Sequence, residues 1–341
     1  MKKLVTILML IPALALIVFV ASCTKEGPAG PAGENGINGT DGTATCSQCH
    51  DSGEAFLGKV IQWEASTHAT GSTFERNTES CAPCHTSMGF KEVIETGENA
   101  TAAPIANPTP VNCYTCHKIH QDYTADDWAL TLTDPVAMRT DGGTYNMGVS
   151  NICAKCHQVN PPNPMPEVGT LDEIEISSPY WGPHHGPQGS MMIGNGGYEI
   201  GSGYENSPHS SMIESGCKQC HMSSAYGTQA GGHQMGMTYA YHGHDVVNKA
   251  GCIECHTNPD NLDAKIEATN LAIETKLTEL QVILMDLGRL DEGNHIIPGT
   301  MPSLHAGAVY NYLYVLEDRS GGSHNYMYAM TLLDNTIAAL Q

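Results

Sequence analysis

The chain has 341 residues, 13 cysteines, 17 histidines and a formal net charge of −21. Its 15 Lys and Arg stand against 36 Asp and Glu, which excludes the basic surface that a nucleic-acid partner requires. Aromatic residues make up only 6 % of the chain, while 36 residues are Gly and 19 are Pro. Side chains alone would therefore build a thin core for this length. So many cysteines argue against an ordinary cytosolic enzyme, and their odd number leaves one thiol outside any set of internal disulfides.

The N-terminus is predicted to be an export signal. Residues 1–3 form a short basic region, and residues 4–20 form an apolar run that ends in small side chains. A transmembrane helix is the alternative, because the run is close to the minimum length for spanning a bilayer. Residues 20–23 (Val-Ala-Ser-Cys) resemble the bacterial lipobox, which implies that residues 1–22 are a lipoprotein signal peptide and that Cys23 is the lipidated first residue. By the same resemblance, Thr24 implies attachment to the outer membrane, with the periplasmic and cell-surface faces both open.

A glycine-rich segment follows. Glycine occupies every third position from Gly27 to Gly42, a pattern that resembles collagen. A collagen triple helix gains from imino acids between the glycines, and only Pro28 and Pro31 supply them here. We interpret residues 23–43 as a flexible tether, with a trimerising stalk as the alternative. The folded part is expected to begin near residue 44.

Twelve of the thirteen cysteines belong to six copies of one motif, C-x-x-C-H, which is the attachment signal for c-type haem. The two thiols bind the two vinyl groups at one edge of a porphyrin, and the adjacent imidazole reaches the iron. A zinc site or a thioredoxin-like dithiol is the alternative. Histidine follows every one of the six pairs, which favours six covalent haems c. The motifs are Cys46-Ser-Gln-Cys49-His50, Cys81-Ala-Pro-Cys84-His85, Cys113-Tyr-Thr-Cys116-His117, Cys153-Ala-Lys-Cys156-His157, Cys217-Lys-Gln-Cys220-His221 and Cys252-Ile-Glu-Cys255-His256.

The motifs are closely spaced. Their first cysteines are 35, 32, 40, 64 and 35 residues apart. Such short segments contain too few residues to surround each porphyrin with protein, so we expect neighbouring haems to lie close together. Six large apolar macrocycles would also replace the missing aromatic core, and their covalent attachment would staple a loop-rich chain. We therefore predict no stable fold without haem.

Eleven histidines remain for the second axial position of the irons. Two histidines per iron would favour electron transfer, because such an iron has no open position for a substrate. His209 and His244 each lie eight residues before a motif, and His120 lies three residues after His117. The remaining candidates from their local context are His68, His184, His185 and His233. Met165, Met191, Met192, Met235 and Met237 are alternative soft ligands.

Several segments together resemble the large bacterial multihaem cytochromes c, distant relatives of ammonia-forming cytochrome c nitrite reductase and the octahaem cytochromes. These segments are Gly182-Pro-His-His-Gly-Pro-Gln188, Ser207-Pro-His209 before Cys-x-x-Cys-His-Met222, Gly231-Gly-His233, and a tail with His324-Asn325. The resemblance implies a mainly α fold with extensive loops, organised around covalent haems and ending in a helical tail. It also favours His184 over His185 and His233 over His244, and it adds His324. The expected distal ligands are therefore His68, His120, His184, His209, His233 and His324.

The chain divides into a hexahaem domain at residues 44–258 and a helical tail at residues 259–341. Apolar residues at three- and four-residue steps predict a helix over residues 261–290. Two more helices are expected over residues 302–318 and 326–340, with Gly321 and Gly322 as the stop between them.

The leading functional hypothesis is a membrane-anchored, extracytoplasmic hexahaem cytochrome that relays electrons between redox partners, including an extracellular acceptor. Its acidic surface would steer it towards positively charged partners. Catalytic residues are not assigned, since all six motifs end in His, whereas the catalytic haem of the nitrite reductases carries Lys. One alternative is an oxidoreductase acting on a small nitrogen or sulfur compound at one open haem. Another is a cytochrome filament in which a histidine of one subunit ligates a haem of the next.

Overall fold

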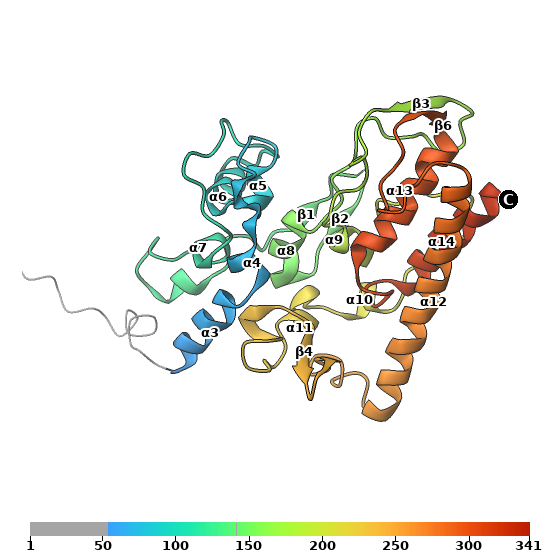
Figure 1. The fold of residues 1–341 in the computed structure, drawn as a ribbon. Helices are drawn as coiled ribbons and strands as arrows, with labels where there is room; N and C mark the ends of the chain where they lie inside the picture. The colour runs from blue at the N-terminus through green and yellow to red at the C-terminus, as the bar shows by residue number, and fades with distance from the viewer. Residues whose placement is uncertain (1–53, 141) are drawn as a thin grey trace, which may run out of the picture. The chain divides into compact units, whose positions relative to one another are not determined.

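The computed structural model describes residues 54–140 and 142–341, all of which belong to one compact unit. The expected signal peptide (1–22), the lipidation site Cys23, the tether (23–43) and the first motif (Cys46, Cys49, His50) lie outside the described residues. The chain is mostly helical, with few short strands and many loops (Figure 1).

The helices of the N-terminal half are short, and the long ones lie at the C-terminus. The α-helices are α3 (Glu54–Glu64), α4 (Thr67–Thr70), α5 (Ala82–His85), α6 (Ser87–Thr96), α7 (Cys113–Cys116), α8 (Asn151–Cys156), α9 (Gln188–Met192), α10 (His209–Met212), α11 (Cys217–His221), α12 (Pro259–Asp286), α13 (Ser303–Asp318) and α14 (Tyr326–Leu340). The 3₁₀ helices are η1 (Ser72–Glu75), η2 (Ala125–Trp128), η3 (Gly148–Ser150) and η4 (Gly232–Gln234).

The strands form three antiparallel pairs, β1–β2, β3–β6 and β4–β5. They are β1 (Val136–Ala137), β2 (Thr144–Tyr145), β3 (Glu173–Ile176), β4 (Thr238–Tyr241), β5 (His244–Val247) and β6 (Gly299–Pro302). In the β3–β6 pair, Glu173 lies opposite Pro302 and Ile176 opposite Gly299, so this pair joins the middle of the chain to the start of α13.

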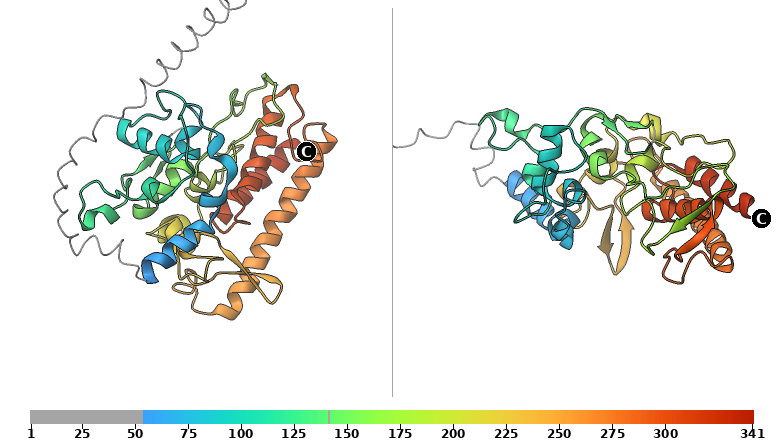
Figure 2. Two further views of the ribbon diagram at one scale, coloured as in Figure 1. Left: turned by 60° about the vertical axis from the view of Figure 1, so that its left-hand side comes forward. Right: turned by 90° about the horizontal axis from the view of Figure 1, so that it is seen from above.

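The three C-terminal helices are those that the sequence predicts, and they lie side by side (Figures 1 and 2). Helix α12 ends at Asp286, four residues earlier than expected. Its last turn is followed by Gly288 with φ of +65°, a left-handed conformation that glycine adopts without the steric cost of a Cβ and that commonly ends helices.

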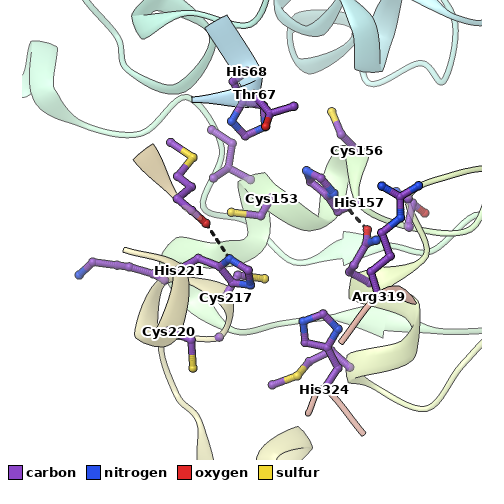
Figure 3. Close-up of a pocket in the computed structure, with 18 of the residues that line it drawn as sticks. Thr67, His68, Cys153, Cys156, His157, Cys217, Cys220, His221, Arg319 and His324 are labelled. Carbon is purple, nitrogen blue, oxygen red and sulfur yellow. Dashed lines mark hydrogen bonds between the residues drawn. The ribbon is translucent and has the colours of Figure 1, made fainter. Parts of the chain in front are cut away.

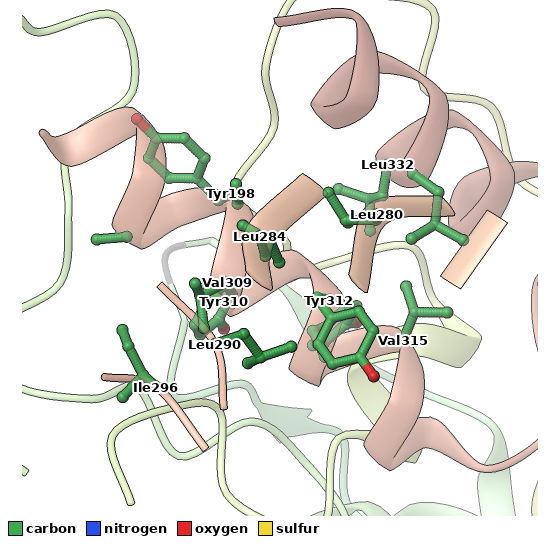
Figure 4. Close-up of a cluster of buried hydrophobic side chains, with 14 of the residues drawn as sticks. Tyr198, Leu280, Leu284, Leu290, Ile296, Val309, Tyr310, Tyr312, Val315 and Leu332 are labelled. Atoms are coloured by element: carbon green, nitrogen blue, oxygen red, sulfur yellow. The ribbon is translucent and has the colours of Figure 1, made fainter. Parts of the chain in front are cut away.

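The main core lies between these helices and the loops that precede them (Figure 4). Leu280 and Leu284 of α12, Tyr310 and Tyr314 of α13 and Leu332 of α14 are fully buried there. The buried tyrosine hydroxyls are satisfied by backbone: Tyr310 donates to the Gly196 carbonyl at 2.7 Å and Tyr314 to that of Asn195 at 2.8 Å. Polar groups in this core therefore fix the loop around residue 195 onto α13.

Removal of one core side chain tests this packing. We expect Leu284→Ala to lower the free energy of unfolding by about 2–5 kcal/mol, because it leaves a cavity in the close-packed cluster. Leu271→Ala is the matched control on the same helix, since Leu271 is 61 % exposed; its effect should stay within about 0.5 kcal/mol. Denaturant unfolding followed by far-UV circular dichroism measures both, and equal losses in the two variants would contradict the assigned core.

Candidate cofactor-binding cavity

Each described C-x-x-C-H motif folds as a single helical turn. In four motifs, the backbone N–H of the histidine donates to the carbonyl of the first cysteine at 2.8–3.2 Å, and in the fifth the motif is helix α11 (Cys217–His221) itself. Residues three and four apart share one face of a helical turn. The turn therefore presents both thiols and the imidazole on the same side.

The five described motifs line one cavity of about 2830 Å³. Both cysteines and the histidine of every one of these motifs are among its lining residues. All ten of these cysteines are free thiols. Figure 3 shows the thiols and rings of the fourth and fifth motifs gathered around a common space. A pocket for one small ligand occupies about 300–1,000 Å³, so this cavity has room for several large groups.

The imidazole of each described motif faces a second imidazole from elsewhere in the chain. The ring centroids are 6.0–6.4 Å apart in all five cases. The pairs are His85 with His184, His117 with His233, His157 with His68, His221 with His324 and His256 with His209. Five of the six histidines expected on the distal side are therefore each brought to a different motif.

The sixth, His120, is placed differently. It lines the same cavity but lies against two tyrosines, stacked on Tyr123 at 5.4 Å and edge-on to Tyr114 at 6.3 Å. His185, which the resemblance ranks below His184, forms an ion pair with Glu317 at 2.9 Å, and its side chain is 72 % exposed. His244 is exposed on β5.

Hydrogen bonds at Nδ1 orient several of the paired rings. Nδ1 of His117, His209 and His221 contacts the backbone carbonyls of Trp128, Ser323 and Met235, each at 2.8 Å. Nδ1 of His157 contacts the side-chain oxygen of Gln188 at 3.2 Å, and that of His324 contacts the carboxylate of Asp318 at 2.7 Å. A hydrogen bond at Nδ1 fixes the tautomer and leaves Nε2 as the metal-binding atom.

Burial disfavours the charged form of the imidazole in several of the paired rings. It lowers the pKa of His68 to about 4, with a further contribution from His157. Burial also lowers the pKa of His85, His184, His221 and His233. Neutral imidazole is the form that binds a metal. His324 differs: burial opposes its charged form, but the adjacent Asp318 outweighs burial and raises its pKa above the usual value.

The charge of the cavity wall is opposite to that of the whole chain. In residues 54–140 and 142–341, the wall contains six cationic side chains and one carboxylate, Asp318. The cations are Lys59, Arg76, Arg139, Lys218, Lys265 and Arg319. The chain overall has more than twice as many acidic as basic residues. The cavity therefore suits groups that carry negative charge.

Thiols of different motifs meet inside the cavity. Hydrogen bonds link the second motif to the fourth, the fourth to the fifth and the fifth to the sixth. The thiol pairs are Cys84 with Cys156, Cys153 with Cys217 and Cys220 with Cys252. Hydrogen bonding lowers the pKa of Cys84 and of Cys252 to about 7. Cys116 of the third motif interacts electrostatically with both cysteines of the fourth, which makes the fourth motif the neighbour of three others.

The residues that hold the rings are absent from the sequence-based set of site residues. The contacts of these rings with Asp318, Gln188 and backbone carbonyls could not be predicted, although Gln188 lies within a segment that carries the resemblance. Asn325 is a partial exception, because it was part of the His-Asn pair in the resemblance. Its buried side-chain oxygen accepts from the Ser207 N–H at 2.8 Å, and its amide donates to the Met191 carbonyl at 3.1 Å. Asn325 thereby fixes the segments that carry His324 and His209 relative to each other.

Comparison with known proteins gives a structural likeness. No protein-family model matches the chain, and no curated protein matches it. Among solved structures, the crystal structure of the outer cell wall cytochrome OcwA superposes with a TM-score of 0.54 at 23 % sequence identity. The chain has the fold of this cytochrome. The likeness covers 83 % of this chain and 50 % of OcwA, so the chain corresponds to half of that protein's length.

Proposed function

We propose that this chain is an exported multihaem c-type cytochrome that carries one covalent haem at each of its six motifs and relays electrons between redox partners. One observation carries the proposal. Five motif histidines each face a second histidine at the same separation, inside a single cavity that is lined by the thiols of the same motifs.

The separation of the rings fits an iron between them. A metal–imidazole bond of about 2.0–2.1 Å on each side places the two nitrogens about 4 Å apart and the ring centres about 6 Å apart. The observed centroids are 6.0–6.4 Å apart. A structural zinc site needs about four protein ligands, and no three His, Cys, Asp or Glu side chains come together to hold a metal within the described ranges. Each pair of imidazoles instead supplies two ligands, which fits a metal whose remaining ligands come from a porphyrin.

The cavity wall fits haem in two further respects. Its volume accommodates several large groups, and its six cations suit the propionate carboxylates that every haem carries. Bound haem supplies a one-electron iron couple. The chain's own residues hold the ring pairs in place, exclude water around them and balance the charge of the propionates.

The paired rings favour a carrier over an enzyme. Each described motif histidine has a partner ring, so a haem iron bound at any of these five motifs would have two histidines to hold it and no open side for a substrate. The alternative, an oxidoreductase acting on a small nitrogen or sulfur compound, requires an iron with an open side. Such an iron would have to belong to the first motif, Cys46, Cys49 and His50, which lies outside the described residues.

Contacts between motifs support a continuous relay. The thiol contacts place the second, fourth, fifth and sixth motifs in a row, with the third beside the fourth. Because the thiols mark one edge of each porphyrin, haems in this row would approach each other closely enough for electron transfer between them. The order differs from the order in the sequence, since the third motif branches from the fourth.

The proposed location rests on the N-terminal residues. We infer that the signal peptide directs export and that Cys23 anchors the protein at the outer membrane, with residues 24–43 as a tether. In the part of the chain that the structure describes, no helix is both long enough and apolar enough to cross a bilayer. Likeness to an outer cell wall cytochrome supports an extracytoplasmic location. The net charge of −21 would favour a positively charged partner at low salt.

Haem content and ligation test this function. Mass spectrometry of the protein matured in a host that attaches c-type haem should show six haems per chain. In the proposed carrier every iron has two histidine ligands, so the reduced protein should have only low-spin spectra and should bind no carbon monoxide. One equivalent of bound carbon monoxide in the wild type would instead support the enzyme with an open first haem, and zinc in place of haem would overturn the proposal.

A further inference from the structure

Asp318 is the only carboxylate that lines the cavity in the described ranges, and it contacts a paired ring directly. Its Oδ1 lies 2.7 Å from Nδ1 of His324, which faces His221 of the fifth motif. The other four Nδ1 contacts of paired rings are made to neutral oxygens, three backbone carbonyls and the Gln188 amide. The fifth motif is therefore distinguished by a charged partner on one of its axial rings.

The carboxylate is held rigidly in this position. Asp318 is the last residue of α13, and its side chain is only 3 % exposed. Its second oxygen accepts a hydrogen bond from the Ser320 hydroxyl, and the Ser320 oxygen in turn accepts the backbone N–H of His324 at 3.2 Å. The turn between them passes through Gly321 and Gly322 in left-handed conformations, with φ of +56° and +91°. The chain thus folds back so that Asp318 and His324 meet.

The adjacent residue Arg319 forms its ion pair elsewhere, and within the described ranges Asp318 forms no ion pair with a Lys or Arg. The Arg319 guanidinium forms its ion pair with Glu317 at 2.8 Å, and its side chain is 69 % exposed. The buried carboxylate therefore acts on His324 through a low-dielectric surrounding, in which electrostatic interactions are strong.

A carboxylate that accepts the Nδ1 proton makes the imidazole a more basic and more electron-rich ligand. Such a ligand stabilises the oxidised iron more than the reduced iron, because the oxidised iron carries one more positive charge. Reduction adds one electron and breaks no bond, so the hydrogen bond acts directly on the reduction potential. A neutral carbonyl that accepts the Nδ1 proton also lowers the reduction potential, but by less, because it carries no full negative charge.

We propose that Asp318 is a positioning residue that makes the haem of Cys217, Cys220 and His221 the lowest-potential centre among the five described motifs. This inference rests on the proposed function. The fifth motif lies between the fourth and the sixth in the row of thiol contacts. An electron moving along the row would therefore cross the haem of lowest potential within the path. During reduction, this haem would be the last to change from the oxidised to the reduced state.

The variant Asp318→Asn tests the inference in the complete, haem-loaded protein. Asparagine keeps an oxygen that can accept the Nδ1 proton but removes the charge. In a spectroelectrochemical titration, one transition, the lowest, should move to a more positive potential. A tenfold rise in the ratio of reduced to oxidised haem at fixed poise corresponds to about 59 mV for a one-electron couple. Electron paramagnetic resonance should show altered g values for one low-spin haem while the others are unchanged.

Two further variants make the result decisive. Asp291→Asn is the matched control, because Asp291 also contacts a histidine, His295, but both side chains are about half exposed and neither lines the cavity; no potential should move. Gln188→Glu adds a carboxylate at Nδ1 of His157 and should lower one potential instead, which keeps the inference testable if Asp318→Asn fails to fold. Unchanged potentials in both cavity variants with six haems attached would overturn the inference alone. Absence of haem at the fifth motif would overturn the proposed function itself.

Discussion

A chain that cannot attach haem will not fold over residues 54–258. In the variant that replaces all twelve motif cysteines by Ala, we expect far-UV circular dichroism to lose most of its helical signal. Amide hydrogen exchange should be unprotected throughout the segments that line the cavity. The reason is the size of the cavity, about 2830 Å³. Without haem, water enters this space and its apolar lining is no longer buried, so the region lacks the hydrophobic stabilisation that offsets the conformational entropy of folding.

The C-terminal helices provide an internal control in the same experiment. Their cluster of buried residues is built mainly from α12, α13 and α14. Among the described residues, none of its fully buried large side chains, which include Leu280, Tyr310 and Tyr314, lines the cavity. We therefore expect residual protection in these helices only. A haem-free chain with native circular dichroism and protection across residues 54–258 would contradict the role of haem as the core of that region.

The C-terminal helices could be predicted because their signals are local. Apolar residues recur at helical spacing, and Gly321 and Gly322 mark a stop. The end of α12 before Gly288 did not follow from this pattern, which predicts a helix to residue 290. The strands could not be predicted in this way. Strand β6 consists of Gly-Thr-Met-Pro, which has little intrinsic preference for a strand, and it forms because β3 lies opposite. Its pairing depends on the fold of the whole chain.

The same difference between local and long-range signals applies to the candidate site. The motif residues could be identified from their spacing, because one helical turn is all that their chemistry needs. Which distal ring faces which motif could not, since His68 pairs with His157 and His117 with His233 across long stretches of sequence. Asp318 could not be assigned a role from the sequence either. It reaches His324 only because the turn through Gly321 and Gly322 reverses the chain.

Removing a distal ring from the central motif should open one iron. We expect His68→Ala to convert one haem from low-spin to high-spin and to bind one carbon monoxide per chain after reduction, against none in the wild type. His68 is the ring that faces His157, with centroids 6.1 Å apart, and alanine leaves no ligand at that position. Visible spectroscopy and titration with carbon monoxide measure the change.

His185→Ala is the matched control for this variant. His185 also lines the cavity, but it forms an ion pair with Glu317, and its ring is mostly exposed. Its removal should leave every haem low-spin. Identical spectra for His68→Ala and the wild type would contradict ligation by His68. Added imidazole should restore the low-spin spectrum of His68→Ala if only the ligand is missing, whereas a variant that had lost its fold would not recover.

The fourth motif is the position where this change should matter most for electron flow. It adjoins the second, third and fifth motifs. Electrons that pass from the second or the third motif to the fifth therefore have to cross the haem of the fourth. Replacing a strong-field histidine by an open or water-filled position changes both the potential and the reorganisation of that iron. Pre-steady-state reduction should therefore become biphasic in His68→Ala, with the haems beyond the fourth motif reduced more slowly than those before it. A uniform rate for all haems would argue against the row of motifs as the electron path.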